Sequence, residues 1–201
     1  RRPPSPSPLY SSAASDVYKR QAYEARINEA EDALSRRGFP RTAIFRQPVV
    51  WGEHDQYQHV NNAHYIRWFE SARMRWMERM SRTLSPEIAS NLVRGRGVGI
   101  ILASTYCRYR RPVTYPDTVV IGQAALPMKF ADRVTVRSQA YSVAQSAIVA
   151  EADFECVAYD YDRLCKASLP PEVADALRAW TYTGEDKEPY CQKTSRRRTV
   201  S

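Results

Sequence analysis

The sequence lacks an apolar run long enough to cross a membrane. Its longest such run, Val98 to Ala103, falls far short of the roughly 20 residues that a transmembrane helix needs. Paired cysteine spacings are also absent, because no CxxC or zinc-finger pattern occurs among Cys107, Cys156, Cys165 and Cys191. We therefore expect a soluble protein with free, buried thiols. A reducing compartment, the cytoplasm or the mitochondrial matrix, fits this cysteine usage best.

The first 21 residues read as a sequencing artefact. Ser11 to Gln21 matches, residue for residue, the in-frame translation of a common transposase sequencing adapter, and Arg1 to Pro4 extends it. We therefore expect residues 1–21 to be adapter-derived, with the natural N-terminus and any transit peptide missing. These residues hold four basic side chains and one acidic side chain, so the net charge of +8 falls to +5 without them.

The remaining positive charge is too dispersed for a nucleic-acid interface. Basic residues cluster only at Arg108, Arg110 and Arg111, and again in the tail at Arg196 to Arg198. No aromatic-basic RNA-binding motif or recognition helix accompanies them. Nucleic acid is therefore not an expected partner, whereas an anionic small ligand is compatible with these charges.

About 180 residues remain, a length typical of one domain with a proper core. The pattern predicts a helical lead-in over Glu24 to Arg37 and a strand from Ile44 to Trp51. A long helix is predicted from Asn62 to Met80. Its apolar positions recur every three or four residues, at Tyr65, Phe69, Ala72, Trp76 and Met80. One face of this helix should belong to the core.

Strands dominate the second half of the chain. Four β-rich segments separated by turn residues are Val98 to Tyr109, Thr118 to Leu126, Arg133 to Val143 and Ile148 to Tyr161. Successive strands without intervening helices predict an antiparallel sheet, so the fold class is α+β, with a long helix wrapped by a curved sheet of about five strands. Short helices are expected over Ser85–Arg94 and Pro170–Trp180. The domain spans 22–182, and 183–201 form a basic tail that we expect to be disordered.

The residues able to carry chemistry gather between the first strand and the long helix. The segment from Trp51 to Asn62 reads WGEHDQYQHVNN and sets acidic and histidine side chains in a turn. Asn61 or Asn62 can cap the helix, whose free amide groups then face the same loop. Because a helix N-terminus stabilises negative charge, a carboxylate beside it, such as Asp55, can act on a polarised carbonyl.

This string resembles the hot-dog fold thioesterases of the 4-hydroxybenzoyl-CoA thioesterase class, whose usual pattern is WGDxDxxGHVNNxxYxxxFExAR. The matching positions are Asp55, His59, Asn61, Asn62, Tyr65, Phe69, Glu70, Ala72 and Arg73. The segment from Tyr109 to Pro112, with Asp117, resembles the next landmark of the family. The similarity extends from residue 40 to residue 165. The matched residues are specific to this family as a combination rather than one by one.

The resemblance implies an acyl-CoA thioesterase that hydrolyses a coenzyme A thioester. Asp55 would be the catalytic carboxylate, acting as nucleophile or as general base, and the amide of Asn62 would polarise the thioester oxygen. His59 and Asn61 would orient the loop, the water or the substrate. In this family the site lies at a dimer interface, so a homodimer or a dimer of dimers is expected.

Further substrate contacts follow from the same resemblance. Tyr65 and Gln58 would contact the acyl group, and Arg110 or Arg111 would pair with coenzyme A phosphates. No separate cofactor is expected, because coenzyme A is part of the substrate.

Two positions depart from the family pattern. Glu53 stands where Asp is usual, which keeps the charge. Gln58 stands where Gly is usual, and if the position needs a positive φ this glutamine is strained by about 1 kcal/mol. The alternative function is therefore a catalytically inactive acyl-CoA binder or a structural subunit of a larger assembly. A hot-dog dehydratase or hydratase would carry a different string around its Asp and His.

The motif residues also have structural interpretations. Asp55 could cap its own turn, and Glu70 could pair with Arg73 on the helix. The cluster of His54, Asp55, His59 and His64 suggests a metal site, but its spacing crosses a turn, lacks the helical HExxH geometry and offers no distant further ligand. We expect no metal, and we expect His54 and His64 to be surface or packing residues.

Overall fold

The computed structural model describes residues 9–185 and 189–190. Its α-helices are α1 (Leu9–Arg36), α2 (Asn62–Ser81), α3 (Pro86–Arg94) and α4 (Pro171–Ala179), and its 3-10 helices are η1 (Arg41–Ala43) and η2 (Trp51–Glu53). The strands are β1 (Ile44–Pro48), β2 (Val98–Tyr109), β3 (Thr118–Ala125), β4 (Arg133–Ser142), β5 (Ala147–Asp160) and β6 (Cys165–Lys166).

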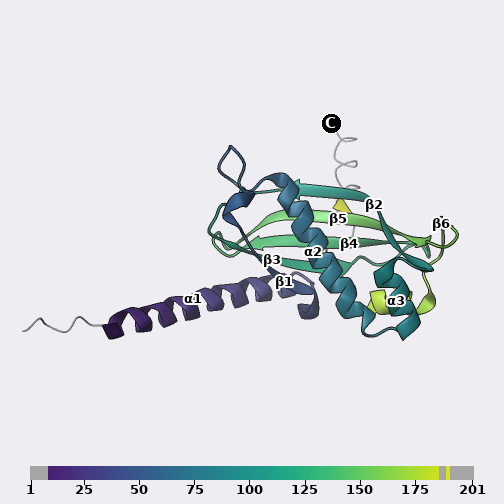
Figure 1. Ribbon diagram of the computed structural model, residues 1–201, viewed down its shortest axis with the longest axis horizontal. Helices are drawn as coiled ribbons and strands as arrows, with labels where there is room; N and C mark the ends of the chain where they lie inside the picture. The colour runs from purple at the N-terminus through teal and green to yellow at the C-terminus, as the bar shows by residue number, and fades with distance from the viewer. Residues whose placement is uncertain (1–8, 186–188, 191–201) are drawn as a thin grey trace, which may run out of the picture.

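One antiparallel sheet carries the fold. Its strand order is β1-β3-β4-β5-β2, and the short β6 pairs with β5. Figure 1 shows α2 crossing one face of this curved sheet, which is the arrangement that the resemblance to hot-dog proteins predicts. The predicted α+β class is therefore confirmed, and the order of the strands places β2 at one edge of the sheet.

Helix α2 buries the face that its periodicity predicts. Tyr65, Phe69, Ala72, Trp76 and Met80 are all at most 3% exposed and pack on the inner face of the sheet. Two further side chains of α2, those of Trp68 and Arg73, are also buried. Arg73 does not pair with Glu70, because its guanidinium lies 4.7 Å above the ring of Phe154.

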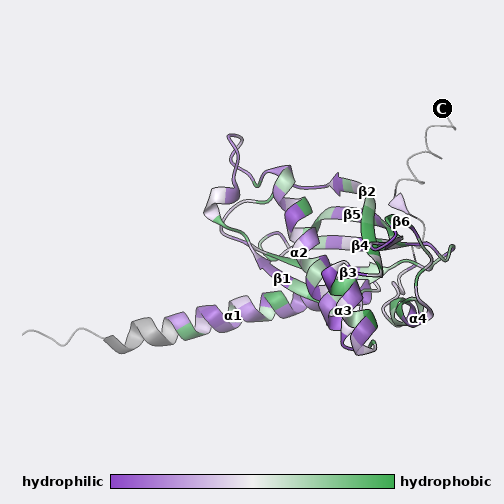
Figure 2. Ribbon diagram, turned by 45° about the vertical axis from the view of Figure 1, so that its right-hand side comes forward, coloured by the Kyte–Doolittle hydropathy of each residue, from purple (hydrophilic) through white to green (hydrophobic). Residues whose placement is uncertain are grey.

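Helix α1 covers part of the outer face of the sheet. Ile27, Ala30 and Leu34 pack with Phe39 and with strand residues of β3. The helix begins at Leu9 rather than at the predicted Glu24, so its first half runs away from the body (Figure 1) and is largely hydrophilic where Figure 2 colours it. The adapter origin of residues 1–21 stays a prediction, because the helical conformation of residues 9–21 does not test it.

The segment after α4 returns to the outer face. Thr183 donates its amide to the Gly38 carbonyl at 3.0 Å, and the ring of Tyr190 lies 3.9 Å from the Arg137 guanidinium. These described parts of the predicted disordered tail therefore contact the folded domain. The rest of the tail, with Cys191, lies outside the described residues.

Three local predictions were wrong in detail. The first strand ends at Pro48, and Trp51 begins a 3-10 helix instead of ending the strand. A sixth strand, β6, had no signal in the pattern because it is two residues long. Cys165 is exposed rather than buried, whereas Cys156 is buried and Cys107 is intermediate. None of the helices in the described part of the chain combines the length and apolar character that a membrane span requires.

Candidate active site

The loop that links β1 to α2 is a tight turn closed by its own backbone. His54 and Val60 form an isolated antiparallel bridge, and the amide of Gln58 donates to the carbonyl of Asp55 at 3.0 Å. Gln58 has a φ of 63°, in the left-handed region that favours glycine. The turn therefore has the backbone conformation that glycine adopts most easily. Because φ is positive at Gln58, the strain predicted for this residue is present.

Asp55 uses its two carboxylate oxygens differently. Its Oδ1 accepts a hydrogen bond from the Tyr57 amide at 2.8 Å, which is the local turn cap that the sequence allowed. Its Oδ2 lies 3.9 Å from Nδ1 of His59, and the side chain of Asp55 is 20% exposed. One oxygen thus orients the carboxylate, and the other faces His59 and remains accessible for chemistry.

The start of α2 leaves one amide available. The side chain of Asn61 accepts a hydrogen bond from the Ala63 amide at 2.9 Å, and its carbonyl accepts one from the His64 amide. The amide of Asn62, the first residue of the helix, has no acceptor within the described ranges. A free N–H at a helix start is the kind of donor that stabilises developing negative charge.

Glu53 ties this loop to the helix. Its Oε1 accepts a hydrogen bond from the Trp68 indole at 2.9 Å, its Oε2 accepts one from the Val50 amide at 2.8 Å, and its backbone carbonyl accepts the Asn61 amide. His64 Nδ1 lies 3.7 Å from the same carboxylate. The substitution of Glu for the usual Asp therefore preserves an acceptor for two donors, and the sequence had assigned Glu53 no such role.

A depression of about 560 Å³ lies beside Asp55. Its lining residues are Trp51, Gly52, His54, Asp55, Gln58, Thr114 and Tyr115. His54, which the sequence placed at the surface or in packing, belongs to this wall, and its Nε2 accepts the Tyr115 amide at 2.8 Å. Asn62 is not among these lining residues, and the roles assigned to Asp55 and to the Asn62 amide stay predictions.

The remaining predicted site residues are dispersed. Tyr65 is 2% exposed in the core, and burial raises its pKa to about 12, so its phenol stays protonated. Arg110 is occupied on the outer face of the sheet, where its Nε donates to Glu151 Oε2 at 2.5 Å. Arg111 is exposed, and no ion pair is seen for it in the part of the chain that the structure describes. Of the two arginines, Arg110 therefore already has a carboxylate partner, and the side chain of Arg111 is exposed.

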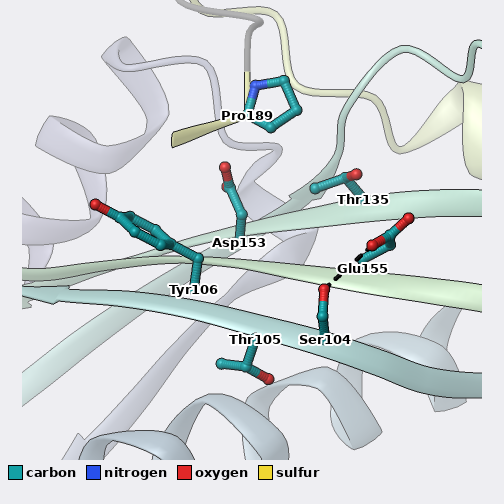
Figure 3. A pocket seen from close by; sticks show the side chains of 7 residues that line it. All are labelled: Ser104, Thr105, Tyr106, Thr135, Asp153, Glu155 and Pro189. Carbon is teal, nitrogen blue, oxygen red and sulfur yellow. Dashed lines mark hydrogen bonds between the residues drawn. The ribbon is translucent and has the colours of Figure 1, made fainter. Parts of the chain in front are cut away.

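A second pocket, of about 280 Å³, lies on the outer face of the sheet (Figure 3). Its walls include Asp153 and Glu155, and Figure 3 shows Ser104 directed toward Glu155, whereas Thr105 points to the opposite face. Both carboxylates are already paired, Asp153 with the buried Arg137 and Glu155 with Arg133. Within residues 9–185 and 189–190 no group of three or more His, Cys, Asp or Glu side chains could hold a metal ion.

The family follows from the extent of the match. The model of the thioesterase-like superfamily matches residues 49–177, from the loop before η2 to α4, which is well over half of the chain. The chain belongs to the thioesterase-like superfamily. This thioesterase-like protein is accordingly a thioester hydrolase of the hot-dog fold, and the match contains the Asp55 turn, the start of α2 and the whole sheet except β1.

Three proteins to which this thioesterase-like chain is similar are distant from it in sequence. A protein of Aquifex aeolicus strain VF5 with a provisional esterase name is 24% identical over 135 residues, which cover 67% of this chain and 97% of that one. A Pseudomonas aeruginosa strain PAO1 protein superposes with a TM-score of 0.59 at 22% identity, covering 71% and 93% of the two chains. A 1,4-dihydroxy-2-naphthoyl-CoA thioesterase from Synechocystis gives 0.57 at 16% identity, covering 67% and 94%.

Proposed function

We propose that this protein hydrolyses an acyl-CoA thioester with Asp55 as the catalytic carboxylate and the Asn62 amide as the donor to the thioester oxygen. The observation that carries the proposal is that the two carboxylate oxygens of Asp55 have different surroundings in the turn. One oxygen of Asp55 is held by the Tyr57 amide while the other is accessible, and the helix start that follows keeps the Asn62 amide without an acceptor among the described residues. A coenzyme A thioester is the substrate class named for the Synechocystis structure.

Two reaction courses use the same groups. As a nucleophile, Asp55 attacks the thioester carbonyl, the C–S bond breaks, coenzyme A leaves as the thiol, and water then cleaves the acyl-aspartyl anhydride. As a general base, Asp55 takes a proton from a water molecule that attacks the carbonyl directly. In both courses the carbonyl oxygen gains negative charge, which the Asn62 amide stabilises.

The surrounding residues take supporting roles. His59, 3.9 Å from Asp55 Oδ2, orients the carboxylate or the water, and Asn61 fixes the first turn of α2 as its cap. Gln58 and His54 lie on the wall of the depression and contact the acyl group or its thioester. Arg111 pairs with a coenzyme A phosphate. Tyr65 supports the site from the core rather than by contact with the substrate.

A second protomer completes the cleft in this proposal. Strand β2 is the edge of the sheet, and Ile101 and Leu102 on it are 40% and 42% exposed. An edge strand of 12 residues that exposes two adjacent large apolar side chains is a template for pairing with another strand. We infer that two copies of β2 pair across a twofold axis, which closes the open side of the Asp55 depression. A reducing compartment stays a prediction.

The test is release of free coenzyme A thiol from a panel of aromatic, short-chain and long-chain acyl-CoAs. The wild-type protein is expected to turn over at least one of them, and Asp55→Asn to lose at least a hundredfold in kcat, the scale of an essential catalytic group. Asn62 cannot be tested by side-chain removal, because its backbone acts. Saturable acyl-CoA binding without thiol release would favour the alternative of an inactive binder, which the strained Gln58 supports.

Isotope labelling separates the two courses. In a single turnover with enzyme in excess in 18O water, product free of label indicates that the oxygen came from Asp55 and therefore that it is the nucleophile. Label found in the Asp55 carboxylate supports the same conclusion, whereas labelled product with an unlabelled protein shows that water attacked the acyl carbonyl, as it does in the general-base course. Light scattering that shows a monomer at micromolar concentration would contradict the shared cleft, and Leu102→Lys is the matched variant expected to weaken the dimer.

A further inference from the structure

The first residue of α2 is held by a side chain of the edge strand. Tyr109, the last residue of β2, donates its hydroxyl to the backbone carbonyl of Asn62 at 3.1 Å. The two residues are 47 positions apart, so this bond is a tertiary contact between the sheet and the helix start. It involves the residue whose amide the proposed function uses.

The ring of Tyr109 is held in place by aromatic packing. It meets the ring of Tyr65 edge-on, with 5.3 Å between centroids and an interplanar angle of 75°. Tyr65 in turn packs on Trp68 at 5.0 Å, and Trp68 donates to Glu53. A continuous set of contacts therefore runs from β2 through the first turns of α2 to the loop that carries Asp55, and such packing limits the hydroxyl to a small range of positions.

Two contacts together fix the orientation of residue 62. On its C-terminal side the Asn62 carbonyl accepts the Tyr109 hydroxyl, and the next amide, that of Ala63, donates to the Asn61 side chain. The Asn62 carbonyl and the Ala63 amide belong to one peptide unit, which both bonds hold. Because Asn62 is the first helical residue of α2, its helical backbone torsions link the orientation of this unit to the direction of its own N–H. We propose that Tyr109 is a positioning residue that aims the Asn62 amide at the thioester oxygen. This inference rests on the proposed thioesterase function.

The protonation states agree with a donor role. Burial raises the pKa of Tyr109 above its ordinary value, so the hydroxyl remains a donor near neutral pH. Burial also raises the pKa of the neighbouring Cys107 thiol, which keeps it protonated near neutral pH. Neither side chain is therefore suited to act as the nucleophile in place of Asp55, and Tyr109 is left with positioning.

The test is Tyr109→Phe, which removes one oxygen and keeps the aromatic packing. Loss of one neutral hydrogen bond to the helix start is expected to lower kcat by about three- to tenfold with KM unchanged, because the amide acts on the transition state more than on the ground state. Tyr161→Phe is the matched control, since its hydroxyl also donates to a backbone carbonyl, that of Ile100, at 3.5 Å. The control is expected to keep the kcat of the wild type.

Each outcome decides the inference. A lower melting temperature with unchanged kcat shows a purely structural tyrosine and overturns it, as does a change confined to KM. If the two variants lose the same fraction of kcat, the effect is not specific to Asn62 and the proposal also fails. A wild-type protein that releases no thiol from any acyl-CoA refutes the proposed function instead, which is a separate result because the inference is scored only against an active wild type.

Discussion

Replacement of glutamine by glycine should raise the stability of the protein at Gln58 and lower it at the nearby Gln56. The φ of 63° at Gln58 places a Cβ in the left-handed region, which costs an L-residue roughly 1–2 kcal/mol. Glycine removes that cost, but it makes the unfolded chain more flexible, which lowers the free energy of unfolding by about 0.5–1 kcal/mol. Because the Gln58 side chain is exposed, little packing is lost. Gln58→Gly should therefore raise the free energy of unfolding by about 0.5–1 kcal/mol.

The matched variants separate backbone strain from loss of the side chain. Gln56 lies in the same exposed loop and is not among the residues with positive φ, so Gln56→Gly should lower the free energy of unfolding by about 0.5–1 kcal/mol. Gln58→Ala keeps the Cβ and should gain nothing. Thermal unfolding measures all three, with an expected rise of about 2–4 °C for each kcal/mol gained. The reasoning is refuted if Gln58→Gly destabilises the protein as much as Gln56→Gly does.

The other predictions concern buried polar groups and thiols. Glu53→Gln should cost about 1–3 kcal/mol in unfolding free energy, since an amide can accept only one of the two N–H donors that the carboxylate accepts, whereas Glu53→Asp should cost less; urea unfolding compares the two. Asp153→Asn should cost about 3–5 kcal/mol, because its arginine partner is buried, while the exposed Asp175→Asn should be neutral. Peptide mass spectrometry after brief alkylation at neutral pH should find Cys165 labelled before Cys107, whose raised pKa keeps thiolate scarce, and the gap should narrow as the pH rises. Equal labelling at neutral pH would contradict this order.

The accuracy of the sequence-based predictions differed from element to element. Helix α2 was predicted to within one residue because its apolar positions repeat regularly from Tyr65 to Met80, and β2 was predicted with the observed bounds. The strand that ends at Pro48 was extended to Trp51, since local β propensity does not reveal where pairing with β3 stops. The two-residue β6 has no periodicity to detect.

The sequence by itself determined the family, the fold class and the order of the residues around Asp55, because these depend on residue type and spacing along the chain. The sequence also indicated the backbone strain at Gln58, because glutamine occupies a position where the family pattern has glycine. Only the tertiary structure decided that Glu53 accepts from both Val50 and Trp68, that Arg110 is taken by Glu151, and that Tyr109 reaches the carbonyl of Asn62. Apart from the local bond between Val50 and Glu53, these contacts join residues that lie up to 47 positions apart, and their partners are selected by the packing of α2 on the sheet or by the pairing of β2 with β5.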